Sequence, residues 1–170
     1  MTVLDAQKKD KWLRFIQQLS ADTDPRKIRV MAQLRMATHA LYQVSEESLA
    51  EANLSYAQFH LLMGLLFNEQ IEDCPAMTPS AISRRQGTSP NTISALIRQL
   101  ENSGLIARAL DTQDRRKFNI RITDAGRRLV QEHAQRHLSS LDAAMAVLDN
   151  TEIETLSRLL DKLSQAVAQE

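Results

Sequence analysis

Residues 78–104 read TPSAISRRQGTSPNTISALIRQLENSG, and this stretch decides the predicted fold. Thr78-Pro79 and Ser89-Pro90 repeat one helix-start signal, a hydroxyl residue at the N-cap followed by proline at the first helical position. Gly87 ends the first short helix and Gly104 ends the second. Two short helices joined by a tight, glycine-containing turn indicate a helix-turn-helix.

The period of the sequence changes directly after this stretch. Residues 105–110 (LIARAL) and 116–122 (RKFNIRI) alternate in the manner of strands, with the polar residues 111–115 (DTQDR) between them. We therefore expect a β-hairpin, or wing, attached to the second short helix. The fold class predicted is a winged helix-turn-helix within a mainly α-helical chain.

The remainder of the chain is expected to be helical, because its 170 residues include only 4 Gly and 4 Pro and only 4% aromatic residues. Apolar spacing and capping residues predict helices over 4–20, 26–50, 55–68 and about 123–148, and a last helix that a capping box at Thr151 and Glu154 begins. The helix over 55–68 has an apolar stripe expected in the core, formed by Phe59, Leu62, Met63, Leu66 and Phe67.

Bulk properties indicate a folded protein of a reducing compartment. The single cysteine, Cys74, excludes an internal disulfide and is interpreted as a structural or incidental thiol. The longest apolar run, residues 61–67, is too short to span a bilayer, and the N-terminus lacks the apolar segment of a signal peptide. These features predict a cytoplasmic protein without a membrane partner.

The net charge is zero, but the charges are unevenly placed. Residues 78–130 hold ten basic and four acidic side chains, so the middle of the chain is basic and its ends are acidic. Such a segment is a possible electrostatic footprint for a polyanion. Because a helix-turn-helix underlies it, the partner expected is double-stranded DNA.

The second short helix is expected to enter the major groove, where the base pairs can be distinguished. Asn91 can pair with adenine, and Arg98 can meet a guanine edge or a phosphate. Arg84 and Arg85 of the first short helix are expected to lie over the DNA backbone. The apolar face of the second helix, Ile93, Leu96, Ile97 and Leu100, should be buried.

The predicted wing tip places acids beside bases, which phosphate attraction alone does not require. A carboxylate such as Asp114 can hold a neighbouring guanidinium in one geometry, which suits insertion of an arginine into a narrow minor groove. The residues expected to contact DNA are Arg84, Arg85, Ser89, Pro90, Asn91, Thr92, Ser94, Arg98, Asp114, Arg115, Arg116 and Lys117.

Residues 54–62 (LSYAQFHLL) and 77–126, with the pattern D-x-x-D-R-R…T-x-x-G at the wing, resemble the MarR family of winged-helix transcription regulators. The resemblance implies a homodimeric, repressor-type regulator of a pseudo-palindromic operator, with Asp114 orienting Arg116 for the minor groove. It also implies dimerisation helices over 1–52 and 127–170 around a DNA-binding lobe at 53–126. The connector 69–77 is longer than is usual in the family, and the helix over 4–20 is additional.

Two of the four histidines, His133 and His137, lie one helical turn apart and can chelate one ion. The pair resembles that of the zinc-sensing MarR-type repressors, which implies His60 as a third ligand. The fourth is His39 by first choice, since position 42 is Tyr; Glu46 or Glu47 are alternatives. The cofactor expected is zinc or another divalent transition metal.

Other interpretations remain open. The same regulator can be switched by an organic, aromatic or anionic ligand in an inter-lobe cleft; that cleft would be lined by Arg35, His39, Tyr42, His60 and Met63. A zinc hydrolase is disfavoured, because Ala134 occupies the place of the catalytic glutamate in H-E-x-x-H. A helical interaction module that no longer binds DNA is a further alternative. The chain is therefore not expected to be an enzyme.

Overall fold

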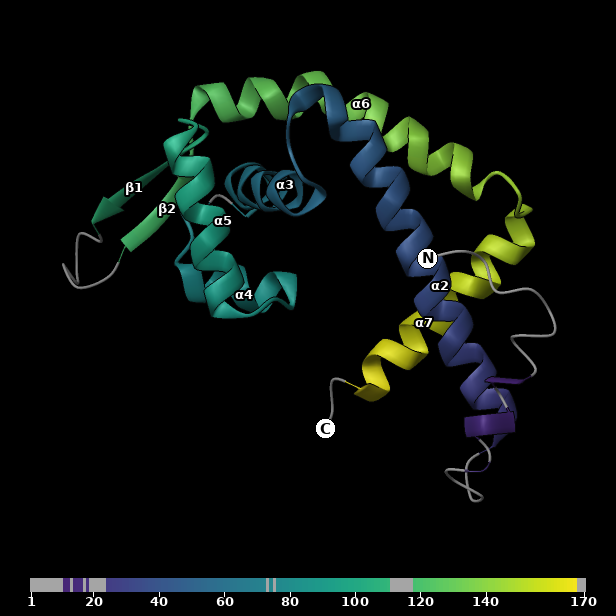
Figure 1. The fold of residues 1–170 in the computed structure, drawn as a ribbon. Coiled ribbons are helices and arrows are strands. Elements are labelled where there is room, and N and C mark those ends of the chain that lie inside the picture. The colour runs from purple at the N-terminus through teal and green to yellow at the C-terminus, as the bar shows by residue number, and fades with distance from the viewer. Residues whose placement is uncertain are drawn as a thin grey trace. The chain divides into compact units, whose positions relative to one another are not determined.

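The computed structural model describes residues 11–12, 14–16, 18, 24–72, 74, 76–110 and 118–167 (Figure 1). The chain divides into two compact units, Met1–Gln43 and Val44–Glu170, and each is described by itself. The predicted division into dimerisation helices and a DNA-binding lobe, at residues 52 and 126, concerns the roles of the parts and stays a prediction.

The described residues of the first unit are helical, except for Asp24. Most of the predicted helix over 4–20 lies outside the described residues, and residues 11–12, 14–16 and 18 are helical. Helix α2 (Pro25–Leu49) confirms the predicted long helix and continues into the second unit. Its start is capped by the Asp24 carboxylate, which accepts a hydrogen bond of 2.9 Å from the Arg26 backbone N–H.

The second unit is built around helix α3 (Tyr56–Gln70), which follows a short 3₁₀ turn, η1 (Ala50–Ala52). Ser55 caps α3 as predicted, and it does so in a complete capping box: its hydroxyl accepts from Gln58 N–H, and the Gln58 side chain accepts from Ser55 N–H. Two donors at the helix start are thereby satisfied.

Helices α4 (Pro79–Gln86) and α5 (Pro90–Asn102) form the predicted helix-turn-helix. The hydroxyls of Thr78 and Ser89 accept the backbone N–H of the third residue after each of them, as N-caps do. Gly87 ends α4 at φ 58°, a left-handed conformation that favours glycine and turns the chain toward α5.

The wing is an antiparallel pair of strands, β1 (Ile106–Leu110) and β2 (Phe118–Ile122), with Ile106 opposite Ile122. Both strands follow the prediction closely, and the tip over 111–117 lies outside the described residues. Met77, before α4, adds an antiparallel bridge to Ile120 through N–O distances of 3.0 and 2.8 Å. The connector before α4 is therefore tied to the wing.

Helix α6 (Asp124–Met145) begins directly after β2, capped by Thr123. Gly126 lies so close to the chain before the wing that an added Cβ would be 2.3 Å from the Leu105 carbonyl oxygen. The glycine of the T-x-x-G pattern is therefore required by this close approach. The helix ends at Met145, three residues before the predicted end.

The last helix, α7 (Asn150–Val167), corrects the predicted capping box. Asp149 and Glu152 form it instead of Thr151 and Glu154: the Asp149 carboxylate accepts from Glu152 N–H at 2.9 Å, and the Glu152 carboxylate accepts from Asp149 N–H at 3.0 Å. A carboxylate caps as well as a hydroxyl does, so the same spacing two residues earlier begins the helix.

The core of the second unit gathers apolar side chains from α3, α4, α5, the wing and α6. Leu62 is fully buried and Leu66 nearly so, but Phe67 is 45% exposed, which corrects its predicted place in the core stripe. The reason is that α3 is covered on several sides, so its buried residues do not follow a single stripe. Within the described part of the chain, no helix has the length and apolarity that a membrane span requires.

Candidate nucleic-acid interface

Helix α5 has two faces of opposite character. Ile93 and Leu100 are fully buried, and Leu96 and Ile97 are nearly so, as predicted. The positions between them are exposed, and they include Asn91, Thr92, Ser94 and Arg98. The buried face fixes the helix on the core, and the exposed face is free to carry hydrogen-bonding groups into a groove.

Local hydrogen bonds order the first turn of α5. The Ser89 hydroxyl lies 2.9 Å from the Thr92 hydroxyl and accepts from the Thr92 backbone N–H, and the Ser94 hydroxyl donates to the Pro90 carbonyl at 2.8 Å. The exposed first turn of a helix also carries the positive end of the helix dipole. This end of α5 is therefore suited to contact an anionic backbone.

Three of the predicted basic residues are engaged in ion pairs within the winged helix. The pairs are Arg85–Glu72 at 3.2 Å, Arg108–Glu101 at 2.8 Å and Arg127–Glu69 at 2.6 Å. Four others have no ion pair with an acid in the described ranges: Arg84, Arg98, Arg121 and Arg128. The basic segment is thus divided between side chains that hold the fold and side chains available to a ligand.

The wing residues of the predicted interface lie outside the described residues. Their roles, Asp114 orienting Arg116 beside Arg115 and Lys117, stay predictions. The strands that carry the tip are described, and the Arg108–Glu101 pair joins β1 to α5. The base of the wing is therefore held to the helix that presents Asn91 and Arg98.

His137 is 6% exposed and lies among side chains from three helical segments. Its Nδ1 is 2.9 Å from the Ser48 hydroxyl oxygen, and that hydroxyl is 2.8 Å from the Ser45 carbonyl oxygen. A hydroxyl has one proton, and the carbonyl can only accept it, so the Nδ1 of His137 must be the donor to Ser48. The lone pair of His137 is thereby on Nε2. Burial lowers the pKa of His137, with a smaller contribution from His60.

Aromatic contacts complete the surroundings of His137. Its ring lies edge-on to Phe59 at 5.2 Å and tilted against Tyr56 at 5.9 Å, and Tyr56 stacks on His60 at 5.6 Å. His60 is exposed, and His133 is half-buried one turn before His137. His60 and His137 thus contact the same tyrosine ring.

The remaining predicted ligands are divided between the two units of the chain. No three His, Cys, Asp or Glu side chains among the described residues are placed to hold one metal ion. His39, Arg35 and Tyr42 belong to the first unit, and His60 and Met63 belong to the second. The four-histidine site and the organic-ligand cleft therefore stay predictions.

Comparison with known proteins places this fold. Residues 54–118 match the model of the MarR family. These residues run from the segment before α3 to the start of β2, and they are similar to the winged helix of that family. The HTH-type transcriptional repressor YetL of Bacillus subtilis is 24% identical over 148 residues, which cover 87% of this chain and 86% of YetL. The HTH-type transcriptional regulator TtmR of Methylorubrum extorquens is 31% identical over 121 residues, covering 67% and 59% of the two chains.

Among solved structures, the S. aureus MepR–DNA complex is similar at 26% identity and a TM-score of 0.69, covering 79% of this chain and 94% of MepR. These MarR-type proteins are transcription regulators and not enzymes, in agreement with the expectation from the sequence. The winged helix of this chain is therefore similar to that of known transcription regulators, and membership of the zinc-sensing subgroup stays a proposal.

Sequence reasoning missed the contacts of three residues in the second unit. Ser48 was not selected, because its contact with His137 joins positions far apart in the chain. Glu72 and Phe67 were not recognised as the partners of Arg85. An acid in the connector, close in sequence to a basic helix, was the only available signal for this contact.

Proposed function

We propose that this chain is a sequence-specific DNA-binding transcription regulator that acts as a homodimer. The observation that carries the proposal is α5, whose apolar face is buried while Asn91, Ser94 and Arg98 are exposed on the other side. Groove-reading helices require this division, because the buried face fixes the angle at which the polar face meets the bases.

The proposed mechanism assigns α5 to the major groove and the wing to the adjacent minor groove. Asn91 can form two hydrogen bonds to an adenine edge, and Arg98 can do so with a guanine. Phosphate contacts come from the capped first turn of α5 and from Arg84, which forms no ion pair with an acid of the described residues; they set the position of the helix without reading sequence. The similarity to MepR, solved in complex with DNA, supports this assignment.

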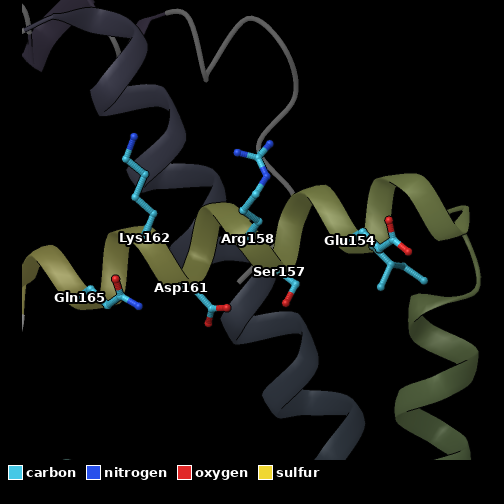
Figure 2. A pocket seen from close by; sticks show the side chains of 7 residues that line it. Glu154, Ser157, Arg158, Asp161, Lys162 and Gln165 are labelled. Atoms are coloured by element: carbon cyan, nitrogen blue, oxygen red, sulfur yellow. The ribbon is translucent and has the colours of Figure 1, made fainter.

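A dimer is proposed because α7 has an apolar row with no buried residue. Leu159, Leu160 and Leu163 are 50%, 39% and 43% exposed. Together with Ile153 and Val167 they form an exposed hydrophobic surface, whose contact with water is unfavourable. Figure 2 shows the polar positions of the same helix, where Glu154, Arg158, Asp161 and Lys162 alternate in charge. An isologous contact between two copies would bury the apolar row.

The test is selection of bound duplexes from a library of random sequence, followed by sequencing. The expected product is an inverted repeat whose half-site centres are about one helical turn, roughly 10 base pairs, apart. A selected pool with no enriched motif would contradict sequence-specific binding. A motif with a single half-site would contradict the dimer.

The effector proposed is a divalent transition metal, with zinc as the first candidate. The protonation of His137 supports this proposal. The neutral imidazole donates its Nδ1 proton to a hydrogen bond with the Ser48 hydroxyl, so the lone pair on Nε2 can bind a ligand. Histidine ligands of metals commonly have such a partner on the second nitrogen. Since no three-ligand group is preformed among the described side chains, uptake requires His60 and His133 to rearrange around His137.

The metal proposal is tested by equilibrium dialysis of the purified protein against zinc, nickel, cobalt and copper. We expect one ion per subunit, and we expect His133→Ala to reduce the affinity while the far-ultraviolet circular dichroism stays unchanged. Uptake that is equal in the parent and in His133→Ala would contradict the site. No uptake at micromolar free metal would favour the organic-ligand cleft of Arg35, His39, Tyr42, His60 and Met63.

A further inference from the structure

The adjacent arginines of α4 have different surroundings. Arg85 lies over α3: its guanidinium carbon is 4.7 Å from the centroid of the Phe67 ring, and its Nη1 is 3.2 Å from Glu72 Oε1. Arg84 has no ion pair or side-chain hydrogen bond with another described residue, and it shares an exposed face with Ser80, one turn earlier. The sequence had assigned both arginines to the DNA backbone.

We propose that only Arg84 contacts DNA phosphate, and that Arg85 is a positioning residue that holds α4 against the carboxyl-terminal end of α3. This inference rests on the proposed function. It changes the interface from two phosphate contacts per α4 to one, and it gives the exposed Phe67 a role in DNA binding without any contact to DNA.

The energetics favour this division. An arginine stacked on an aromatic ring contributes about 0.5–1 kcal/mol at an exposed site, and an exposed ion pair adds about 0.2–1 kcal/mol. A phosphate contact by Arg85 would forfeit both interactions and would leave the Glu72 carboxylate unpaired near a polyanion. Arg84 gives up no such interaction when it moves to a phosphate.

The end of α3 is a suitable anchor, because other contacts fix it. Arg127 of α6 forms a two-bond contact with Glu69, through Nε–Oε2 at 2.8 Å and Nη2–Oε1 at 2.6 Å. Asn68 is buried, its side-chain amide donates to the Cys74 backbone carbonyl, and its backbone carbonyl accepts from the Cys74 N–H. Arg85 therefore joins α4 to an end of α3 that other contacts already hold in place.

The test compares Arg84→Ala with Arg85→Ala, which remove one equal charge from neighbouring positions. Binding to a fluorescent duplex of random sequence is measured over a range of salt concentration, and the slope of log K against log salt is taken for each variant. Arg84→Ala should reduce the slope by about 0.9 per subunit, or about 1.8 per dimer. Arg84→Lys should retain the parent slope.

Arg85→Ala should leave the slope unchanged and weaken binding by a common factor of about two to ten at every salt concentration. Phe67→Leu should produce part of this loss, because the Glu72 ion pair remains, and the double variant Phe67→Leu/Arg85→Ala should be no weaker than Arg85→Ala. Equal slope reductions in Arg84→Ala and Arg85→Ala would overturn the inference. So would additive losses in the double variant. A parent protein with no salt dependence would instead overturn the proposed function.

Discussion

The Nδ1 of His137 on α6 lies 2.9 Å from the hydroxyl oxygen of Ser48, at the end of α2. Because the Ser48 hydroxyl donates its hydrogen bond to the Ser45 carbonyl, the imidazole is held in the Nδ1-protonated form. The contact joins α6 to the segment that enters α3. It makes the charge state of one buried imidazole part of the stability of the second unit.

Stability should fall as the pH is lowered through the titration of His137. Burial lowers the pKa of His137 from 6.5, so the unfolded chain binds more protons than the folded chain between 6.5 and the folded value. The folded state is therefore fully stabilised by the neutral imidazole at pH values above 6.5. This stabilisation is lost as the pH falls through the pKa of His137 in the folded protein. Urea denaturation across this range should show a smaller pH dependence for His137→Asn than for the parent; equal dependence would disprove the role of His137.

Gly126→Ala should destabilise the protein by about 1–3 kcal/mol, as overpacking of a close contact does. The added Cβ would meet the Leu105 carbonyl oxygen at 2.3 Å, and neither backbone segment can move without disturbing the base of the wing. The matched control is Gly64→Ala in α3, whose Cβ would meet only the Gln86 side chain at 3.9 Å. Thermal or urea unfolding measures both, and the control should be neutral or stabilising by about 0.5–1 kcal/mol.

Asn91→Ala should weaken binding to the selected DNA site by about 1–3 kcal/mol and relax the preference at one base pair. The reason is that an exposed amide on α5 can form paired hydrogen bonds with an adenine. Affinities for the site and for single-base variants of it provide the measurement. A uniform loss over all sequences would show instead that Asn91 contacts the DNA backbone.

Leu163→Glu should convert the dimer into monomers, because it places a charge in the apolar row of α7. Gln165→Glu is the matched control, since it adds the same charge at a polar position of the same helix, shown in Figure 2. Sedimentation velocity distinguishes the two species. Dimers that persist in Leu163→Glu would place the subunit contact elsewhere.

Arg116→Ala should weaken operator binding by about 1–3 kcal/mol if the side chain enters the minor groove. Asp114→Ala should lose part of that amount, because the guanidinium is then no longer held in one geometry. Anisotropy titrations with the selected duplex measure both variants. Parent-like affinity in both would show that the wing tip does not read the DNA.

Local signals predicted the elements that local physics determines. Thr78 and Ser89 begin their helices as caps whatever the rest of the chain does, and alternation in the two strands predicts the hairpin with nearly correct ends. The capping box before α7 was misplaced because two overlapping spacings fit the same rule. The helix begins after Asp149 and not after Thr151, because the carboxylates of Asp149 and Glu152 each accept a hydrogen bond from the other residue's backbone N–H.

Contacts between segments that are far apart in the chain could not be predicted from the sequence. The burial of His137 against Ser48 depends on how α2, α3 and α6 pack, and nothing near either residue indicates the other. The same holds for Arg85, which as an exposed base on a short helix suggests phosphate binding until Phe67 and Glu72 are placed beside it. The spacing of His133 and His137 was read correctly as one helical turn, but it did not reveal that one ring is buried and the other half-exposed.

The connector between α3 and α4 is fastened at two points by backbone hydrogen bonds: Cys74 N–H to the Asn68 carbonyl at 3.1 Å, and Met77 with Ile120 in both directions. Chain inserted between Asn68 and Cys74 would form a loop whose two ends are already fixed. The start of α4 would keep its place, because the Met77 bridge sets it independently of the length before it. The connector is thus a position where proteins of this fold can lengthen or shorten, or accept an inserted peptide tag, without moving the helix-turn-helix.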